Sequence, residues 1–268
     1  MSIFDKYNKR AKKINSLLCV GLDSDFEKLP KKFKSFKHPQ FEFNKTMIKE
    51  THEYAAAFKV NSAFYEARGD RGIKELRMTI EHLNRNYPDI FTILDAKRAD
   101  IGNTNQGYAA FSFDWLDFDA ITLNPYLGKE ALLPFLERVD KGCIILCRTS
   151  NQGAREFQDL KIKNKPLWQI VAERVSKNWN KNKNCMLVVG ATYPKEMKKI
   201  RKTVGDMTLL IPGIGAQGGD LKNAIKFGTN SIGLGLMIHS SRGIIFSSNP
   251  KKEARKLYDE IRKYRTVL

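Results

Sequence analysis

Cysteine and histidine are scarce in this chain, with four of each among 268 residues. The cysteines form no Cys-x-x-Cys pair, and each lies within an apolar stretch, so we expect small buried side chains rather than zinc ligands or a redox pair. They are Cys19, Cys143, Cys147 and Cys185. The histidines are far apart and show no metal-ligand spacing, although His239 lies near a candidate phosphate loop. The sequence therefore predicts no metal site.

Long apolar runs are also missing. No stretch approaches the roughly 20 apolar residues that a membrane-spanning helix needs. Residues 1–14 mix charged and isolated apolar residues and lack the pattern of a secretory signal. We therefore expect a soluble protein of the cytoplasm, where cysteines stay reduced, with no membrane partner.

Acidic side chains are few relative to basic ones, with 29 Asp and Glu against 47 Lys and Arg and a formal net charge of +18. Such a balance is compatible with nucleic-acid binding. The lysines, however, are scattered in short clusters at helical spacing, without the interleaved aromatic residues of a nucleic-acid platform. We expect a lysine-rich solvated surface that attracts an anionic substrate, and no nucleic-acid partner.

Short apolar or β-branched runs alternate with longer amphipathic stretches along the chain. Buried parallel strands are predicted at 17–21, 57–60, 91–94, 120–123, 143–146, 186–189, 208–211 and 231–234. Helices are predicted at 73–86, 167–179, 194–204, 221–227 and 253–264, and the Lys- and Asn-rich segment 178–184 is expected to be a polar surface loop.

About eight β-then-α units in some 250 residues are typical of a TIM barrel. We therefore predict an α/β protein with a single (β/α)8 barrel domain spanning residues 1–268. A doubly wound open sheet is the alternative, but no Gly-x-Gly-x-x-Gly follows the first strand.

Charged residues follow the first three predicted strands. Asp23 comes after the first strand and Lys59 lies in the second, while Asp95 and Lys97 follow the third. In this fold function collects at the carboxyl ends of the strands, and alternate side chains share a face of a strand. The sequence therefore predicts one cluster of charges of alternating sign.

Two glycine-rich segments follow the last strands. Residues 212–219, which begin with Pro212, come after the seventh strand. Residues 233–235 are expected after the eighth strand, followed by Ser-Arg-Gly at 241–243. Glycine lets backbone N–H groups approach an anion closely, and arginine binds it in a bidentate manner. Because loops seven and eight commonly hold phosphate in this fold, we expect a phosphorylated ligand.

The segment 94–104, Leu-Asp-Ala-Lys-Arg-Ala-Asp-Ile-Gly-Asn-Thr, resembles the D-x-K-x-x-D-I signature of the orotidine 5'-phosphate decarboxylase family. Matching segments occur in the family's order at 21–23, 58–61, 147–151, 212–217 and 241–242. The resemblance extends from Asp23 to Arg242. It is closest to the longer, bacterial-type branch, in which Thr-Ser-Asn follows the fifth strand.

Magnesium-dependent sugar-phosphate decarboxylases and aldolases of the same superfamily share D-x-K-x-x-D and remain the alternative. In those relatives the second strand tends to carry an acidic metal ligand, whereas this chain has Lys59 there. Because a lysine repels a divalent cation, Lys59 favours the branch that uses neither metal nor cofactor, and Ser150 and Gln217 favour it too.

The resemblance implies a role for each position. Asp23 and Lys59 would hold the ribose hydroxyls and orient the charge network. Ser150 would bind the amide edge of the pyrimidine. Pro212 belongs to the substrate loop. The 5'-phosphate would be held by Gln217, which also reaches the base, by Arg242, and by the backbone near Gly215 and Gly235.

The resemblance also implies the reaction, which converts orotidine 5'-monophosphate to uridine 5'-monophosphate during pyrimidine synthesis. Asp95 would face the departing carboxylate, and Lys97 would stabilise and protonate the carbanion at C6. Asp100, Ile101 and Thr104 would reach into the site of a neighbouring subunit. We therefore expect a homodimer with shared active sites.

Overall fold

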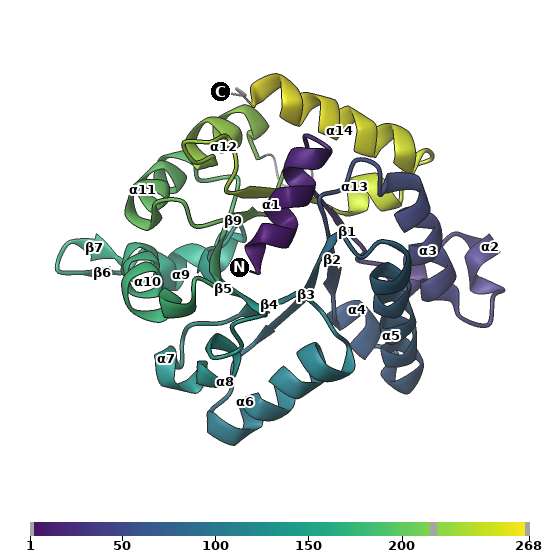
Figure 1. Cartoon of the computed structure of the whole chain (residues 1–268), viewed down its shortest axis with the longest axis horizontal. Coiled ribbons are helices and arrows are strands. Elements are labelled where there is room, and N and C mark those ends of the chain that lie inside the picture. Colours follow the sequence, from purple (N-terminus) through teal and green to yellow (C-terminus); the bar gives the residue numbers. More distant parts are fainter. Residues whose placement is uncertain (1–2, 215–218, 266–268) are drawn as a thin grey trace.

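In the computed structural model, which describes residues 3–214 and 219–265, eight parallel strands close into a barrel in the order β1-β10-β9-β8-β5-β4-β3-β2. Figure 1 shows helices around the outside of this barrel. The barrel strands are β1 Leu18–Gly21, β2 Ala57–Asn61, β3 Phe91–Arg98, β4 Ala120–Leu123, β5 Gly142–Arg148, β8 Cys185–Val189, β9 Leu209–Ile211 and β10 Leu236–Ser240. The predicted (β/α)8 barrel is confirmed.

Five of the longer helices lie where the sequence predicts a helix: α5 Gly69–Asn86, α10 Leu167–Arg174, α11 Pro194–Val204, α12 Leu221–Gly228 and α14 Pro250–Tyr264. Three more lie where the sequence predicts none: α1 Phe4–Lys13, α3 Pro39–Thr51 and α6 Gly102–Ala109. Shorter helices are α2 Lys31–Lys34, α4 Ala63–Glu66, α7 Gly128–Ala131, α8 Leu133–Leu136, α9 Arg155–Gln158 and α13 Arg242–Ile245, and a hairpin joins β6 Lys161–Ile162 to β7 Lys165–Pro166. Within the described ranges no helix is both long and apolar enough to span a membrane.

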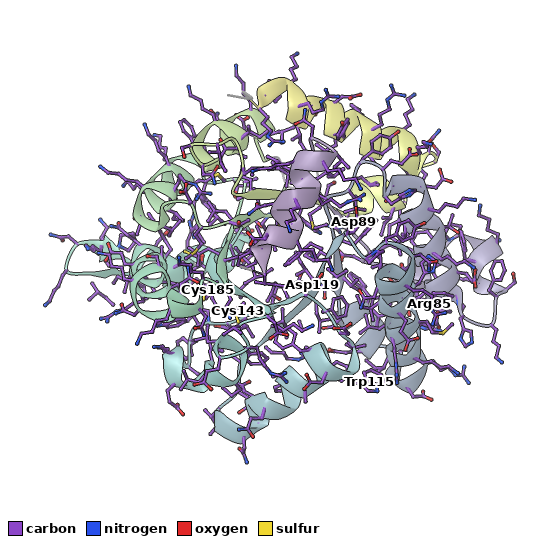
Figure 2. The ribbon with its side chains drawn as sticks, in the orientation of Figure 1. Arg85, Asp89, Trp115, Asp119, Cys143 and Cys185 are labelled. Atoms are coloured by element: carbon purple, nitrogen blue, oxygen red, sulfur yellow. The ribbon has the colours of Figure 1, made fainter. Side chains whose placement is uncertain are left out.

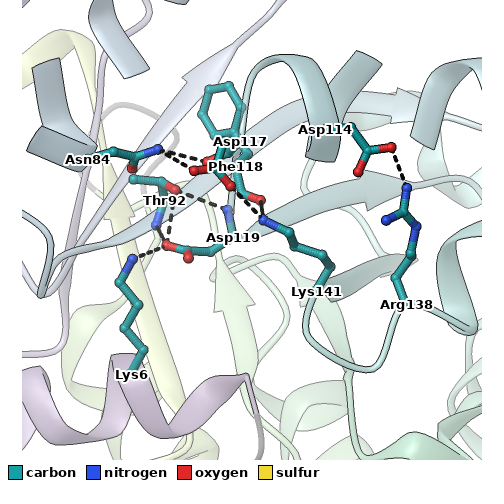
Figure 3. A network of polar contacts seen from close by, with 9 residues as sticks. All are labelled: Lys6, Asn84, Thr92, Asp114, Asp117, Phe118, Asp119, Arg138 and Lys141. Atoms are coloured by element: carbon teal, nitrogen blue, oxygen red, sulfur yellow. Dashed lines mark hydrogen bonds and ion pairs between the residues drawn. The ribbon is translucent and has the colours of Figure 1, made fainter. Parts of the chain in front are cut away.

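Helix α1 crosses the amino-terminal end of the barrel (Figure 1). The hydroxyl of Tyr7 donates to the carbonyl of Leu236, the first residue of β10. Lys6 forms a 2.7 Å ion pair with Asp119, just before β4, and Asp119 also accepts the hydroxyl of Thr92 at 3.0 Å (Figure 3). This end of the barrel is thereby closed, and a ligand has access from the carboxyl ends of the strands.

The packing agrees with most of the sequence interpretation. All four cysteines are buried and free, and Cys143 lies beside Cys185 on neighbouring strands (Figure 2). Many side chains that carry nitrogen extend outward from the helices around the barrel (Figure 2). The expectation of a surface loop is wrong at Asn184, which is fully buried. Its side-chain amide can be buried there because it donates to the carbonyls of Leu136, Arg138 and Lys141.

The last predicted strand, 231–234, is wrong. The chain turns there because Asn230 Oδ1 accepts the N–H groups of Ile232 and Leu234, at 3.2 and 2.9 Å, and because Gly233 and Gly235 have φ of 66° and 76°. The strand β10 begins after this turn. Gly235 therefore lies before the last strand rather than after it.

Candidate active site

A cavity of about 750 Å³ opens at the carboxyl ends of the barrel strands. Seven of the predicted site residues, contributed by six strands or the loops after them, share its lining. They are Asp23, Lys59, Asp95, Lys97, Ser150, Pro212 and Arg242. Residues that lie far apart in the sequence are thus brought to one place by the parallel barrel.

Asp95 lies at the centre of a charged cluster. Its Oδ2 accepts from Lys59 Nζ at 2.7 Å, and its Oδ1 accepts from Lys97 Nζ at 2.7 Å. Asp23 Oδ1 lies 3.8 Å from Lys59 Nζ. The predicted cluster of alternating charge is therefore confirmed, with Asp95 hydrogen-bonded to both lysines and Asp23 at ion-pair distance from Lys59.

The contacts keep Asp95 and Lys59 ionised. Burial alone would raise the pKa of Asp95, but the ammonium groups of Lys59 and Lys97 outweigh it and hold this pKa well below its usual range. Burial likewise favours neutral Lys59, yet the carboxylates of Asp23 and Asp95 raise its pKa above the ordinary value. The site therefore contains fixed charges of both signs at neutral pH.

The two lysines differ in exposure. The side chain of Lys59 is 4% exposed, whereas that of Lys97 is 50% exposed. Lys97 lies in an irregular part of β3, where the pairing register with β4 shifts between Leu94 and Arg98. Its φ is 47°, in the left-handed region. Asp95 and Lys97 thus meet through a bulge as well as through strand alternation.

His239, which the sequence placed only near the phosphate loop, lies in the wall of the cavity beside this cluster. A Cβ atom on Gly21 would lie 2.6 Å from His239 Nε2, so the glycine makes room for the ring. Burial and the nearby charge of Lys59 lower the pKa of His239 to about 3. The imidazole is therefore neutral at physiological pH.

The loop after β5 presents Ser150 to the cavity and is held from behind. Gln158 accepts the backbone N–H of Thr149 at 2.9 Å and donates to its hydroxyl at 2.8 Å. A Cβ atom on Gly190 would lie 2.8 Å from Ser150 Cβ, so only glycine permits this approach. The position of Ser150 is thereby fixed by neighbours that the sequence interpretation did not identify.

Arg148, at the end of β5, supports the same loop. Its side chain is 1% exposed, and its guanidinium lies 3.8 Å from the centroid of the Tyr193 ring. It also contacts Asp159 at 3.3 Å. This buried arginine links the loop after β5 to the loop after β8.

The structure locates some of the residues that the sequence predicts to bind the phosphate. Arg242 is the first residue of α13 and lines the cavity together with Pro212. Gly235 is a wrong prediction, because it lies at the amino end of β10, where its carbonyl accepts from Leu209 N–H at 2.9 Å and Arg201 at 2.7 Å. Gly215 and Gln217 lie outside the described residues.

The three residues assigned to a neighbouring subunit stand apart from the described cavity lining. Ile101 is 60% exposed, and Thr104 is exposed on the first turn of α6. Asp100 accepts the N–H of Ile101 at 2.7 Å, and its own N–H donates to Asn105 at 2.9 Å. These contacts order the segment after β3 and leave Ile101 and Thr104 facing outward.

Comparison with known proteins agrees with this arrangement. The family described as orotidine 5'-phosphate decarboxylase / HUMPS matches residues 16–257. Orotidine 5'-phosphate decarboxylase of Christiangramia forsetii is 50% identical over 237 residues, covering 88% of this chain and 86% of the relative. That of Cellvibrio japonicus is 46% identical over 251 residues, covering 93% and 91%.

A solved structure supports the same assignment. The OMP decarboxylase of Leishmania donovani superimposes with a TM-score of 0.89 at 40% identity and covers 99% of both chains. The match includes the barrel and the helices around it. By sequence and by structure, the chain belongs to the orotidine 5'-phosphate decarboxylase / HUMPS family.

Proposed function

We propose that this chain is an orotidine 5'-phosphate decarboxylase, which converts orotidine 5'-monophosphate to uridine 5'-monophosphate and CO2 in pyrimidine synthesis. The names of its relatives support this activity. The observation that carries the proposal is the position of Asp95 between two ammonium groups, each 2.7 Å away, in the cavity at the carboxyl ends of the strands.

The two lysines have different tasks in this proposal. Lys59 is buried between two carboxylates that raise its pKa, so it is a poor proton donor and instead fixes Asp95 and Asp23. Lys97 contacts one carboxylate and is half exposed to the cavity. Lys97 is therefore the ammonium that can reach a substrate and transfer a proton.

The reaction needs no electron sink beyond these charges. The bond between C6 and the carboxylate carbon breaks, CO2 leaves, and the electron pair stays on C6. Lys97 Nζ stabilises this pair and donates a proton to C6, and water then reprotonates the amine. Asp95 faces the substrate carboxylate, where two like charges about 4 Å apart repel by about 4 kcal/mol at an effective dielectric constant near 20.

The remaining contacts bind the nucleotide. Asp23, fixed by Lys59, would accept ribose hydroxyls, and Ser150 would bind the amide edge of the base. Arg242 and the loop that begins at Pro212 would hold the 5'-phosphate, together with Gln217 and Gly215. Binding of this remote phosphate would contribute to the rate by holding the reacting carbon against Lys97.

We also propose that the active form is a homodimer in which Asp100, Ile101 and Thr104 complete the partner's site. The outward position of Ile101 and Thr104 supports this arrangement. A cytoplasmic location fits four free, buried cysteines. One domain over residues 1–268 is supported by contacts between the two ends, since the Tyr258 hydroxyl donates to the Ile14 carbonyl at 3.0 Å.

The test uses the purified chain with orotidine 5'-monophosphate, followed by its ultraviolet absorbance, with and without EDTA. We expect conversion to uridine 5'-monophosphate at the same rate in both conditions. A magnesium-dependent sugar-phosphate lyase would instead leave orotidine 5'-monophosphate intact and lose its own activity in EDTA. No turnover of the nucleotide would refute the proposal.

A further inference from the structure

The backbone conformation of Lys97 must be stabilised by contacts with neighbouring residues. Its φ of 47° is disfavoured for a residue with a Cβ atom, because the side chain then crowds the following carbonyl oxygen. The register shift between β3 and β4 at this point also interrupts the regular ladder of hydrogen bonds. A neighbouring group must therefore satisfy the Lys97 N–H and hold the bulge.

Thr122 of β4 provides that support. Its side chain is 1% exposed, and its hydroxyl oxygen accepts the N–H of Lys97 at 2.9 Å. The same hydroxyl donates to Asp95 Oδ1 at 2.8 Å. An amide N–H can only donate and an ionised carboxylate can only accept, so both partners fix the orientation of the hydroxyl.

These contacts close a ring through one lysine. Asp95 Oδ1 accepts from both the Thr122 hydroxyl and Lys97 Nζ, so the backbone and the ammonium of Lys97 are joined through two neighbouring side chains. Asp95 Oδ2 is held separately by Lys59. Rotation of the Asp95 carboxylate would break at least two of these bonds.

We propose that Thr122 is a positioning residue, which sets the place of Lys97 Nζ and the orientation of Asp95 for the decarboxylation proposed above. It acts through these two residues and supplies no proton to the substrate. The inference rests on the proposed function, because it concerns the geometry of the group that protonates C6.

A buried threonine that joins β3 to β4 can also be purely structural, and the chain contains such a case. Thr92 is 1% exposed, and its hydroxyl donates to Asp119 Oδ2 at 3.0 Å and accepts the Asp119 N–H at 3.1 Å. This pair lies at the amino end of the barrel, beside Lys6 of α1 (Figure 3). Thr92 is therefore a matched control in the same pair of strands.

The experiment compares Thr122→Val, Thr122→Ser and Thr92→Val in the full chain. Valine keeps the shape of threonine and removes the hydroxyl. We expect Thr122→Val to lower kcat for orotidine 5'-monophosphate by about 10²-fold, because displacement of a reacting group by about 1 Å has such an effect. The inhibition constant of uridine 5'-monophosphate should stay within about 3-fold, since the phosphate and base contacts remain.

The two comparison variants separate positioning from stability. Thr122→Ser keeps the hydroxyl and should retain a kcat near that of the wild type. Thr92→Val should lower Tm and leave kcat unchanged. Should Thr122→Val fail to fold, Thr122→Ala provides the same comparison with the serine variant.

The outcomes distinguish this inference from the proposed function. A wild-type chain that fails to convert orotidine 5'-monophosphate refutes both. An active wild type with an unchanged kcat in Thr122→Val refutes the role of Thr122 alone. A loss of kcat in Thr122→Ser as large as in Thr122→Val would also overturn it, because the hydroxyl would then not be the determining group.

Discussion

The Nζ atom of Lys59 lies 2.7 Å from Oδ2 of Asp95, and both side chains are almost fully buried. Removal of one member of such a buried pair destabilises the fold, because the remaining charge loses its partner and is not solvated by water. The contact between Lys97 and the same carboxylate has equal length but involves a half-exposed side chain. The two lysines should therefore contribute differently to stability.

We predict that Lys59→Met lowers the free energy of unfolding by about 3 kcal/mol. Lys97→Met should change it by less than about 1 kcal/mol, since solvent screens an exposed ion pair. Both variants should lose activity. Urea denaturation of the two variants beside the wild type measures the difference, and equal losses of stability would contradict the distinction between the lysines.

Arg242 is predicted to act on the phosphate. Arg242→Ala should reduce kcat/KM for orotidine 5'-monophosphate by about 10- to 100-fold, because a hydrogen bond to a charged group is worth about 1.5 to 3 kcal/mol. The kcat/KM for orotidine, which lacks the phosphate, should change little. Arg255→Ala removes a 70% exposed guanidinium from α14 and is the charge-matched control. Equal losses for both substrates would place Arg242 outside the phosphate site.

His239 should make stability depend on pH. Burial and the charges of Lys59 and Lys97 lower its pKa from 6.5 to about 3, and the carboxylates of Asp23 and Asp95 offset this only in part. The unfolded chain therefore binds more protons between these values, so stability is complete above pH 6.5 and falls as the pH decreases toward 3. The contribution is up to about 1.4 kcal/mol per pH unit.

The measurement is the free energy of unfolding between pH 7 and pH 5, above the range in which most carboxylates titrate. His239→Gln should show a smaller loss over this interval than the wild type. His52→Gln is the control, because the His52 ring lies at the surface against the carbonyl of Lys49. Identical slopes for His239→Gln and the wild type would contradict the prediction.

Much of the site could be predicted from the sequence because a parallel barrel brings all strand ends together. Alternation along β3 and the closeness of neighbouring strands predict Asp23, Lys59, Asp95 and Lys97 in one cluster, and the bulge in β3 also brings Lys97 to Asp95. These rules need only the spacing of residues along a strand and the fold class, and both can be inferred from the sequence.

Other parts depend on contacts that spacing does not encode. Thr122 has the sequence signature of an ordinary β-branched strand residue, and the hydrogen bond from Lys97 N–H to its hydroxyl arises only at the bulge in β3. The apolar pattern predicts the eighth strand at 231–234, but Asn230 caps a turn there and β10 begins only at Leu236. In α1 the buried residues Phe4, Tyr7 and Ala11 have helical spacing, but spacing alone does not place this helix across the amino end of the barrel.

The shared site is predicted to allow complementation between inactive variants. Neither Lys97→Ala nor Asp100→Ala should support much activity alone. In a mixed dimer, the chain with intact Lys97 meets the intact Asp100 of its partner, which rebuilds one of two sites. Random exchange makes about half of the dimers mixed, so about a quarter of all sites should recover.

Subunit exchange is confirmed with two differently tagged variants before the assay. Each variant taken alone through the same exchange procedure is the control, and it should stay inactive. If Asp100 acts within its own chain, every site keeps one lesion and the mixture stays inactive. That result, with exchange demonstrated, would refute the shared site.

Lys97 is the proton donor of the proposed mechanism, and the single-turnover rate of Lys97→Ala with orotidine 5'-monophosphate tests this role most directly. The half-exposed side chain can be removed without loss of the packed barrel, so the variant should fold and still bind uridine 5'-monophosphate. We predict a decrease in rate of at least about 10⁴-fold, the upper range for a positioned acid. A rate near that of the wild type would contradict the proposed mechanism.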